Sequence, residues 1–280
     1  MTSNKEHSFI RFLYGCPFGR ETLKVLFKLG IAKQMAFYMK SPLSRGMARR
    51  YIKRYDIDMS QYVDTRYRSF ADFFSREKKE TANDPDPSHF VSPCDGWLSI
   101  SRVSRDSSFS IKDSLYSVGD LIQDEELQKS FEDGLCLIFR IAAPDYHRYF
   151  YFDSGYIHEG HYIEGKLHSV QPIACSAYPV FRQNRRVWHL FETENFGNAV
   201  QVEIGALAVG GINNYHSNAN VAKGSEMGRF ELSGSTITVF LEKDRLELLP
   251  EVTEVLKRGE EFRVTQGMWI ANSLNKNEKL

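Results

Sequence analysis

The residues Gly234-Ser235-Thr236 place a hydroxyl group directly before the apolar and β-branched run 237–241. Glycine adopts backbone angles that are closed to residues with a Cβ, so the pattern predicts a tight bend that leads into a stiff strand. In the simplest interpretation the bend is an ordinary turn, because Gly and Ser are common turn residues. In the chemical interpretation, Ser235 attacks the carbonyl group of Gly234 and the chain cuts itself at this bond.

Two residues upstream have side chains that could assist such chemistry. Asp95 lies in Pro-Cys-Asp-Gly, where Asp-Gly by itself predicts a turn, although a carboxylate can also orient a histidine. His147 lies in Tyr-His-Arg, after an apolar run that ends near Ile141. A histidine among aromatic residues is often structural, but its imidazole is also suited to proton transfer near neutral pH. Both roles stay open for each residue on this pattern alone.

The other histidines give weaker signals. His158 and His161 superficially resemble a metal-binding pair, but their spacing on a predicted strand or turn is not the helical HExxH face of a zinc protease. We therefore expect no metal site. His168, in Leu-His-Ser-Val, is a further candidate, whereas the remaining histidines have no supporting context: His7, His89, His189 and His216.

The elements that must position these residues are mainly strands. From Phe90 onward, short apolar or alternating runs are separated by turns, which predicts a mainly antiparallel β domain with one helix around 124–131. A polar, proline-containing stretch at 83–87 predicts a linker before it. The expected fold class is therefore α+β. The predicted strands are 97–103, 135–141, 156–163, 187–192, 199–209, 230–232 and 236–241.

The N-terminal part has a different character. Residues 8–57 contain eleven Lys and Arg residues against two acidic ones, and apolar residues recur every three or four positions. This predicts amphipathic basic helices, broken near Pro17, Gly30 and Pro42. Such helices are typical of in-plane association with an anionic membrane surface. A soluble helical hairpin that packs on the main domain is the other interpretation, and RNA binding is less favoured because no reader motif accompanies the charge.

Composition sets wider limits. The 280 residues are 42% apolar, enough for a real core, and the 36 basic residues balance the 36 acidic ones. The four cysteines form no CxxC pair, which fits a reducing compartment. Charges interrupt every apolar run well short of about 18 residues, so we expect no membrane-spanning helix.

Taken in order along roughly residues 65–245, the motifs resemble those of phosphatidylserine decarboxylases. Each motif is weak alone, and their shared order makes the resemblance specific. They are Phe73-Phe74-Ser75-Arg76, Pro93-Cys94-Asp95-Gly96, Tyr146-His147-Arg148, Asn184-Arg185-Arg186-Val187 with Leu190-Phe191-Glu192-Thr193, Val202-Glu203-Ile204-Gly205-Ala206 with Val209-Gly210, Lys223-Gly224-Ser225-Glu226-Met227-Gly228-Arg229-Phe230, and Gly234-Ser235-Thr236.

The resemblance implies a proenzyme that cleaves itself between Gly234 and Ser235, giving a β chain of residues 1–234 and an α chain of residues 235–280. It implies that Ser235 becomes an N-terminal pyruvoyl group, the cofactor, with no metal. That group would form a Schiff base with phosphatidylserine and accept the electrons released as carbon dioxide leaves, giving phosphatidylethanolamine. Asp95, a histidine and Ser235 would form the self-cleavage set, with His147 as the acid that protonates the α carbon.

The chain departs from the family pattern at one histidine. Many members have Tyr-His-Arg-x-His, with one imidazole for self-cleavage and the other for decarboxylation, whereas this chain has Phe150 at the second position. Many members also have Phe where this chain has His168. We therefore hypothesise that His168 supplies the missing imidazole from an adjacent strand; otherwise His147 serves both steps.

These inferences predict a basic amphipathic membrane-association region at 1–60 and a β-rich catalytic domain at 61–280. The expected protein is a peripheral enzyme on the cytoplasmic face of a bacterial-type cell membrane, an α/β heterodimer after cleavage, with a homodimer also possible and no nucleic-acid partner. Two other functions stay open: a pyruvoyl-dependent decarboxylase of a soluble amino acid, and an uncleaved lipid-binding relative without activity.

Overall fold

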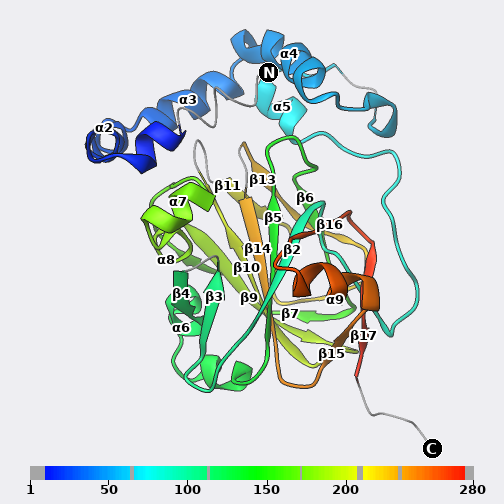
Figure 1. Cartoon of the computed structure of the whole chain (residues 1–280). Helices are drawn as coiled ribbons and strands as arrows, with labels where there is room; N and C mark the ends of the chain where they lie inside the picture. Colours follow the sequence, from blue (N-terminus) through cyan, green and yellow to red (C-terminus); the bar gives the residue numbers. More distant parts are fainter. Residues whose placement is uncertain are drawn as a thin grey trace, which may run out of the picture.

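The computed structural model describes residues 10–63, 66–111, 114–170, 172–206, 211–232 and 235–274. N-terminal helices form a layer across one end of a β-rich body, whose strands run away from that layer (Figure 1). The segment 79–88, which contains neither helix nor strand, connects the two parts along the side of the body. The mixture of helices and antiparallel sheets confirms the predicted α+β class.

The helical layer follows the breaks that the sequence predicts. Pro17 begins α2 at a position where a missing N–H costs nothing, and the preceding Cys16 sulfur accepts the Gly19 N–H (3.3 Å). Gly30, with φ +63°, separates α2 from α3, and Pro42 begins η1. None of the helices in the described ranges is both long and apolar enough to cross a membrane. The elements are α2 (Pro17–Lys28), α3 (Ile31–Lys40), η1 (Pro42–Ser44), α4 (Arg45–Tyr55), η2 (Met59–Gln61) and α5 (Phe70–Phe74).

A nine-stranded antiparallel sheet forms the centre of the body. Its order is β12-β7-β9-β10-β14-β5-β2-β16, and β8 also pairs with β9. The strand β14 therefore lies between β10 and β5, with neighbours on both sides. The strands are β2 (Gly96–Arg102), β5 (Leu135–Ile141), β7 (Gly155–Ile157), β8 (His161–Ile163), β9 (Arg186–Thr193), β10 (Asn198–Ile204), β12 (Ala219–Val221), β14 (Ser235–Leu241) and β16 (Phe262–Val264).

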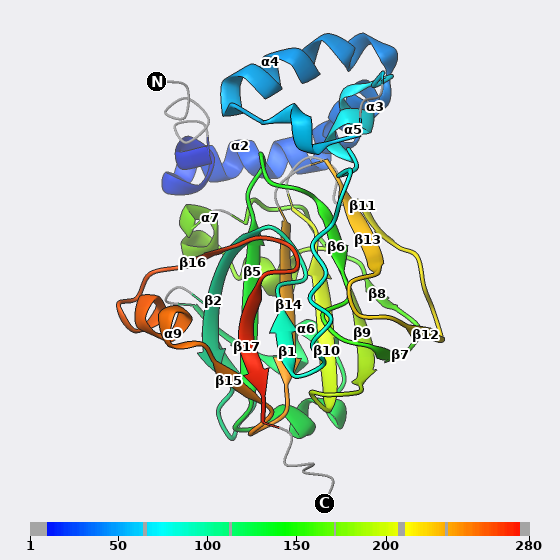
Figure 2. The same ribbon diagram turned by 90° about the vertical axis from the view of Figure 1, so that its right-hand side faces the viewer.

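Smaller sheets and helices complete the body. In Figure 2, β1 and β17 lie side by side in front of the central sheet, in a sheet of order β1-β17-β15. The other small sheets have the orders β11-β13-β6 and β3-β4. Their strands are β1 (His89–Val91), β3 (Ser108–Ile111), β4 (Ser114–Ser117), β6 (Arg148–Phe150), β11 (Gly211–Asn214), β13 (Glu226–Glu231), β15 (Leu246–Leu248) and β17 (Trp269–Ser273); the helices are α6 (Val118–Ile122), η3 (Leu127–Phe131), α7 (Pro172–Ala177), α8 (Val180–Gln183) and α9 (Pro250–Lys257).

Each face of the central sheet carries its own apolar core. All seven residues of β14 are buried, as expected for a strand covered on both faces. Because side chains alternate between the two faces along β14, Ile237 and Val239 lie in one core with Phe139 of β5. Phe240 lies in the other core with Val202 of β10. We call these the Ile237 face and the Phe240 face.

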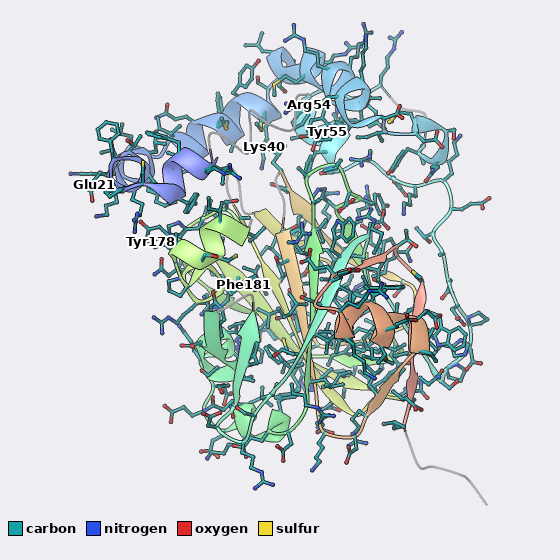
Figure 3. The ribbon with its side chains drawn as sticks, in the orientation of Figure 1. Glu21, Lys40, Arg54, Tyr55, Tyr178 and Phe181 are labelled. Carbon is teal, nitrogen blue, oxygen red and sulfur yellow. The ribbon has the colours of Figure 1, made fainter. Side chains whose placement is uncertain are left out.

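Several contacts tie the helical layer to the body, and two of them lie far apart along the layer. Lys40 at the end of α3 pairs with Glu231 at the end of β13 (2.7 Å). Tyr14 packs edge-on against Tyr178, which follows α7, with ring centroids 6.0 Å apart. Figure 3 shows Lys40 and Tyr178 between the layer and the body, which places the layer directly over the strand ends.

Three predicted elements differ from the structure. Residues 124–131 form a helix only as the 3-10 segment η3, because Asp124 accepts the N–H groups of Glu126 and Leu127 in a preceding turn (3.1 and 2.9 Å). The predicted strand 156–163 is two short strands, β7 and β8, which pair with different parts of β9. The predicted strand 199–209 is confirmed only as β10, which ends at Ile204; residues 205 and 206 lie in no strand, and 207–209 lie outside the described residues. The remaining predicted strands are confirmed, with ends shifted by a few residues.

Candidate active site

Ser235 lies at one end of the central sheet, in a row with two other strand ends. The register pairs Ser235, the first residue of β14, with Ile141, the last residue of β5. The next strand, β2, pairs Trp97 with Arg140, so Gly96 at its start lies beside Ile141. A Cβ on Gly96 would lie 2.7 Å from the Arg140 carbonyl oxygen, so only glycine permits this close approach. Asp95, one residue before Gly96, therefore lies at the same end of the sheet as Ser235.

The Ser235 hydroxyl is buried, with 1% of the residue exposed, and its oxygen has no hydrogen-bond partner in the described part of the chain. A buried hydroxyl without a partner costs free energy, so such groups in folded proteins call for an explanation. By alternation along β14 its side chain belongs to the Ile237 face. Ser233 and Gly234, on the other side of the predicted cleavage bond, lie outside the described residues.

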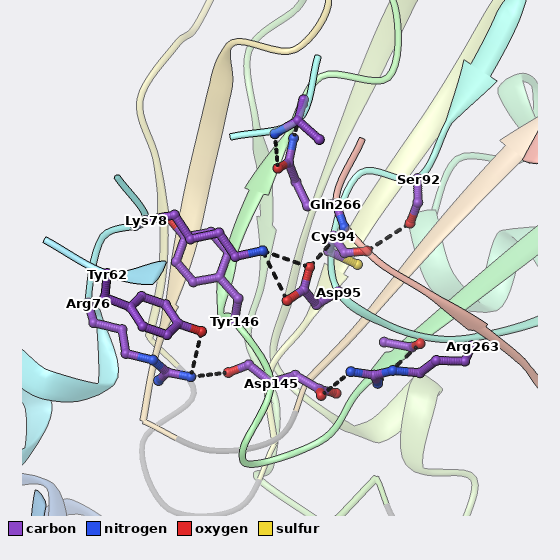
Figure 4. A network of polar contacts seen from close by, with 12 residues as sticks. Tyr62, Arg76, Lys78, Ser92, Cys94, Asp95, Asp145, Tyr146, Arg263 and Gln266 are labelled. Atoms are coloured by element: carbon purple, nitrogen blue, oxygen red, sulfur yellow. Dashed lines mark hydrogen bonds and ion pairs between the residues drawn. The ribbon is translucent and has the colours of Figure 1, made fainter. Parts of the chain in front are cut away.

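Asp95 is buried and is held by two donors. Its carboxylate lies 3.2 Å from the Lys78 ammonium through each oxygen, and one oxygen accepts the N–H of Gln266 (2.8 Å). Figure 4 shows this arrangement, in which Lys78 and Gln266 approach the carboxylate from different segments. The sequence indicated a carboxylate that could orient a histidine; among the described residues, the group that pairs with it is Lys78.

His147 lies in the loop between β5 and β6. Its Nε2 donates to the carbonyl oxygen of Ala143 (3.1 Å), which leaves Nδ1 as the lone-pair nitrogen. No hydrogen bond to Nδ1 occurs within the described ranges. Burial lowers the pKa of His147 to about 3, an effect that the Ala143 carbonyl and the charge of Asp95 partly offset. The imidazole is therefore neutral at physiological pH and able to accept a proton.

The loop that carries His147 is fixed by two ionic side chains. Arg76 donates through Nη2 to the carbonyl oxygens of Pro144 (2.9 Å) and Asp145 (3.1 Å). The Asp145 carboxylate accepts the Ala142 N–H (2.8 Å) and pairs with Arg263 (2.7 Å), as Figure 4 shows for the ionic pair. Because each of these contacts lies within a few residues of the imidazole, they hold its ring in one place.

His168 lies on the other side of the sheet. Its ring stacks on Tyr178 (4.8 Å between centroids) and meets Phe27 edge-on (5.0 Å), and its Nδ1 lies 3.3 Å from the Tyr14 hydroxyl. These aromatic rings belong to or pack against the core of the Phe240 face, opposite the face of Ser235. Burial lowers the pKa of His168 to about 4. The structure thus brings Asp95 and His147 to the end of the sheet that carries Ser235, and places His168 under the helical layer.

The side chain of Asn184 links the backbone of His168 to the central sheet. It accepts the His168 N–H (2.9 Å) and donates to the carbonyl oxygens of His168 (2.9 Å) and Gly205 (2.8 Å). Gly205 follows Ile204, which pairs with Thr236, so the segment is anchored one strand away from Ser235. The segment of His168 is therefore joined to a strand next to β14, but the sheet separates the His168 side chain from Ser235.

Sequence reasoning missed a buried pair on the Ile237 face. His189 Nδ1 lies 3.4 Å from a carboxylate oxygen of Glu203, and both residues are almost wholly buried. Gln201 and Asn214 donate to the same carboxylate (2.8 and 3.2 Å). Glu203 lies opposite Ile237, two residues along β14 from Ser235. Glu203 belongs to the motif Val202-Glu203-Ile204-Gly205-Ala206, but nothing local in the sequence indicated that it would meet His189.

Within the described ranges, no three His, Cys, Asp or Glu side chains gather in a way that could hold a metal ion. His161 stacks on Trp188 (4.1 Å between centroids), and His158 pairs with Glu192 (2.7 Å). His158 and His161 therefore both contact side chains of β9.

At one end of the central sheet lie a buried serine hydroxyl without a hydrogen-bond partner among the described residues, a neutral imidazole and a carboxylate held by a lysine. The chain matches the family model described as phosphatidylserine decarboxylase over residues 70–268. It belongs to the phosphatidylserine decarboxylase family, and it is an enzyme of the decarboxylase class.

Curated relatives cover nearly the whole chain. A phosphatidylserine decarboxylase proenzyme 2 from Clostridium acetobutylicum is 36% identical over 261 residues, which span 92% of this chain and 89% of the relative. A phosphatidylserine decarboxylase proenzyme from Clostridium botulinum strain Alaska E43 is 34% identical over 276 residues, 95% of this chain and 93% of the relative. One from Desulfitobacterium hafniense is 33% identical over 266 residues, with 92% and 89% covered.

Proposed function

We propose that the protein decarboxylates phosphatidylserine to phosphatidylethanolamine by means of a pyruvoyl group made from its own Ser235. In this proposal the chain cuts itself between Gly234 and Ser235, which leaves a β chain of residues 1–234 and an α chain of residues 235–280. The single observation that carries the proposal is the Ser235 hydroxyl: buried, without a partner in the described residues, and in one row with Gly96 and Ile141.

The self-cleavage chemistry needs only atoms of the chain and one water. The Ser235 oxygen bonds to the Gly234 carbonyl carbon as the amide C–N bond breaks, so the link between the two residues becomes an ester. Loss of the α proton then releases the carboxylate of Gly234 and leaves a carbon–carbon double bond in residue 235. Water adds, ammonia leaves, and the product is the pyruvoyl group. A hydroxyl where Ser235 lies fits this precursor role.

His147 is the base that we assign to the first step. Its neutral imidazole, with Nδ1 as the lone-pair nitrogen, can take the proton from the Ser235 hydroxyl. The negative charge of Asp95 favours the imidazolium that results. Acid and base assistance of this kind speeds a reaction by about 10² to 10⁴. In the decarboxylation the same imidazole, once protonated, is the acid that we assign to the α carbon of the product.

The pyruvoyl group supplies an electron sink next to the amino group of the substrate, so that the carboxyl group can leave as carbon dioxide. The chain's own contribution is to bury the site and to hold the proton donor. Burial of Ser235 and His147 excludes water from the place where the proton is delivered.

The helical layer is the lipid-facing surface in this proposal. Its exposed apolar side chains lie among basic ones, and a lysine or arginine near an anionic leaflet contributes about 1 kcal/mol. This layer lies over the end of the sheet that carries Ser235, so a bound membrane would lie on the side of the active site (Figure 1). We therefore propose peripheral association with the cytoplasmic face of the membrane. The most exposed apolar residues of the layer are Phe18 (75%), Leu29 (58%), Phe37 (80%) and Leu43 (82%).

Two measurements on the purified full chain test the proposed function. Mass spectrometry under denaturing conditions should find two pieces, the smaller beginning at residue 235 without a free amine, whereas Ser235→Ala should give one species of 32.3 kDa. Release of carbon dioxide should occur from phosphatidylserine vesicles and not from free serine. An intact wild-type chain would support the uncleaved lipid-binding relative instead, and activity on free serine would support a decarboxylase of soluble amino acids.

A further inference from the structure

The carboxylate of Asp95 is a buried charge whose ionic partner is a lysine. The side chains of Lys78 and Asp95 are only 14% and 12% exposed, and the ammonium lies 3.2 Å from both carboxylate oxygens (Figure 4). A pair this well shielded from water is not an ordinary surface ion pair, because removing one partner leaves the other charge buried and uncompensated.

Lys78 is held in this position by Tyr146. The Lys78 N–H donates to the Tyr146 hydroxyl (3.3 Å), and the ammonium lies over the same ring, 4.6 Å from its centroid. The backbone of Lys78 also forms a bridge with Tyr62. Tyr146 directly precedes His147, so the lysine joins the carboxylate to the loop that carries the imidazole.

Phe150 lies close to the turn that carries Asp95. The Phe150 N–H donates to the carbonyl oxygen of Pro93 (2.8 Å), two residues before Asp95, and its ring stacks on Tyr146 (6.3 Å between centroids). Position 150 therefore lies beside the turn that carries the carboxylate. A phenylalanine there offers no hydrogen bond, whereas many family members have a histidine at this position. The ammonium of Lys78 supplies the contact that the phenyl ring does not.

We propose that Lys78 is a positioning residue for self-cleavage, an inference that rests on the proposed function. Its ammonium fixes the Asp95 carboxylate at the end of strands β2, β5 and β14, where that charge favours transfer of the Ser235 proton to His147. The lysine keeps its own protons throughout and forms no bond to the reacting atoms.

The test compares the rate of self-cleavage of freshly synthesised full-length chains, followed by denaturing gel and mass. Lys78→Met should slow cleavage by on the order of tenfold or more, part of the 10² to 10⁴ that acid and base assistance supplies. Lys78→Arg should restore most of the rate, because it keeps the charge. Lys79→Met is the matched control, since the neighbouring Lys79 is exposed, and it should cleave at the wild-type rate.

A double-mutant cycle separates positioning from a general effect on stability. If Lys78 acts through Asp95, Lys78→Met should slow cleavage no further in an Asp95→Asn background. Phe150→His combined with Lys78→Met should regain cleavage, because an imidazole then lies beside the carboxylate. If Lys78→Met fails to fold by circular dichroism, Lys78→Gln, which keeps an N–H donor without the charge, replaces it in every comparison.

Three results would overturn the proposal. They are wild-type cleavage by folded Lys78→Met, additive effects of the Lys78 and Asp95 changes, and failure of Lys78→Arg to recover any rate. These outcomes differ from failure of the proposed function, because in that case the wild-type chain itself would stay intact and behave like Ser235→Ala.

Discussion

The imidazole ring of His147 stacks on the ring of Phe74, with 4.1 Å between the two centroids. Phe74 ends α5 and packs in a core cluster with residues of the helical layer, such as Tyr51. The residue to which we assign proton transfer is thus packed directly against the part of the molecule that we assign to the membrane.

Burial of His147 predicts a loss of stability in mild acid. The pKa of His147 is about 3 in the folded chain against an ordinary value of 6.5. Between these pH values the imidazole is protonated in the unfolded chain and neutral in the folded chain. The contribution of neutral His147 to the free energy of unfolding is fully present above pH 6.5 and falls as the pH drops toward 3. Between pH 7 and pH 5 the free energy of unfolding should fall by about 2 kcal/mol through this residue.

Urea unfolding at pH 7 and pH 5 checks this expectation in a Ser235→Ala background, which keeps the protein as one chain. His147→Gln should remove about 2 kcal/mol from the difference between the two pH values. His168, whose pKa burial lowers to about 4, remains in both proteins and cancels in the comparison. Equal pH dependence with and without His147 would show that the imidazole is not buried in its neutral form.

His168→Ala decides between the two histidines. Because His168 packs with Tyr14, Phe27 and Tyr178 on the Phe240 face, we expect this variant to cleave itself and to lose thermal stability through lost packing. Mass spectrometry and a melting curve on the same sample measure both effects. An intact chain that melts like the wild type would instead support the sequence-based hypothesis that His168 is the replacement imidazole.

Arg76→Lys tests whether the loop before His147 must be held by a guanidinium. The Nη2 atom of Arg76 donates to two carbonyl oxygens. The ammonium of a lysine, at the end of a side chain with different geometry, cannot reproduce both hydrogen bonds. We expect a loss of about 1 to 3 kcal/mol in stability and self-cleavage slowed at least tenfold. Arg68→Lys is the control because its side chain is 90% exposed, and it should change neither quantity.

Phe37→Glu tests the lipid-facing surface separately from catalysis. Phe37 lies in α3 with 80% of its surface exposed, so an acidic replacement should weaken sedimentation with anionic vesicles and leave self-cleavage intact. Binding should also weaken as salt is raised. Tyr162→Glu, at an aromatic residue of β8 that is 51% exposed, is the matched control outside the layer. Equal vesicle binding by both variants would contradict the assignment of this surface.

Local sequence pattern predicted the strands that build the site, because β-branched and apolar runs between turns are a short-range signal. The bounds of β5 were predicted to the residue, and Ser235 was expected at a strand start. The role of Lys78 could not be predicted in this way. It lies in the charged run Glu77-Lys78-Lys79-Glu80, which is typical of an exposed surface, and its burial depends on Asp95 and Tyr146, which are distant in sequence.

The location of His168 shows a second limit. The family resemblance led to the hypothesis that His168 supplies an imidazole from an adjacent strand. His168 lies in no strand, and its segment is anchored next to β10 through Asn184. Which face of the sheet it occupies depends on how the N-terminal helices pack, since Tyr14 and Phe27 surround it. Contacts between segments separated by more than a hundred residues leave no periodic signal in either segment.

The central position of β14 has a consequence for the stability of the cleaved protein that we propose. Once the chain is cut before Ser235, the α chain still supplies β14 between β10 and β5, β16 on β2, and β17 on β1. The two polypeptides are then interleaved through separate sheets, and neither can leave without destroying the core. Unfolding would release two independent molecules whose reunion depends on concentration. Under the proposed cleavage, refolding would therefore require two polypeptides to meet, whereas the uncut chain would refold alone.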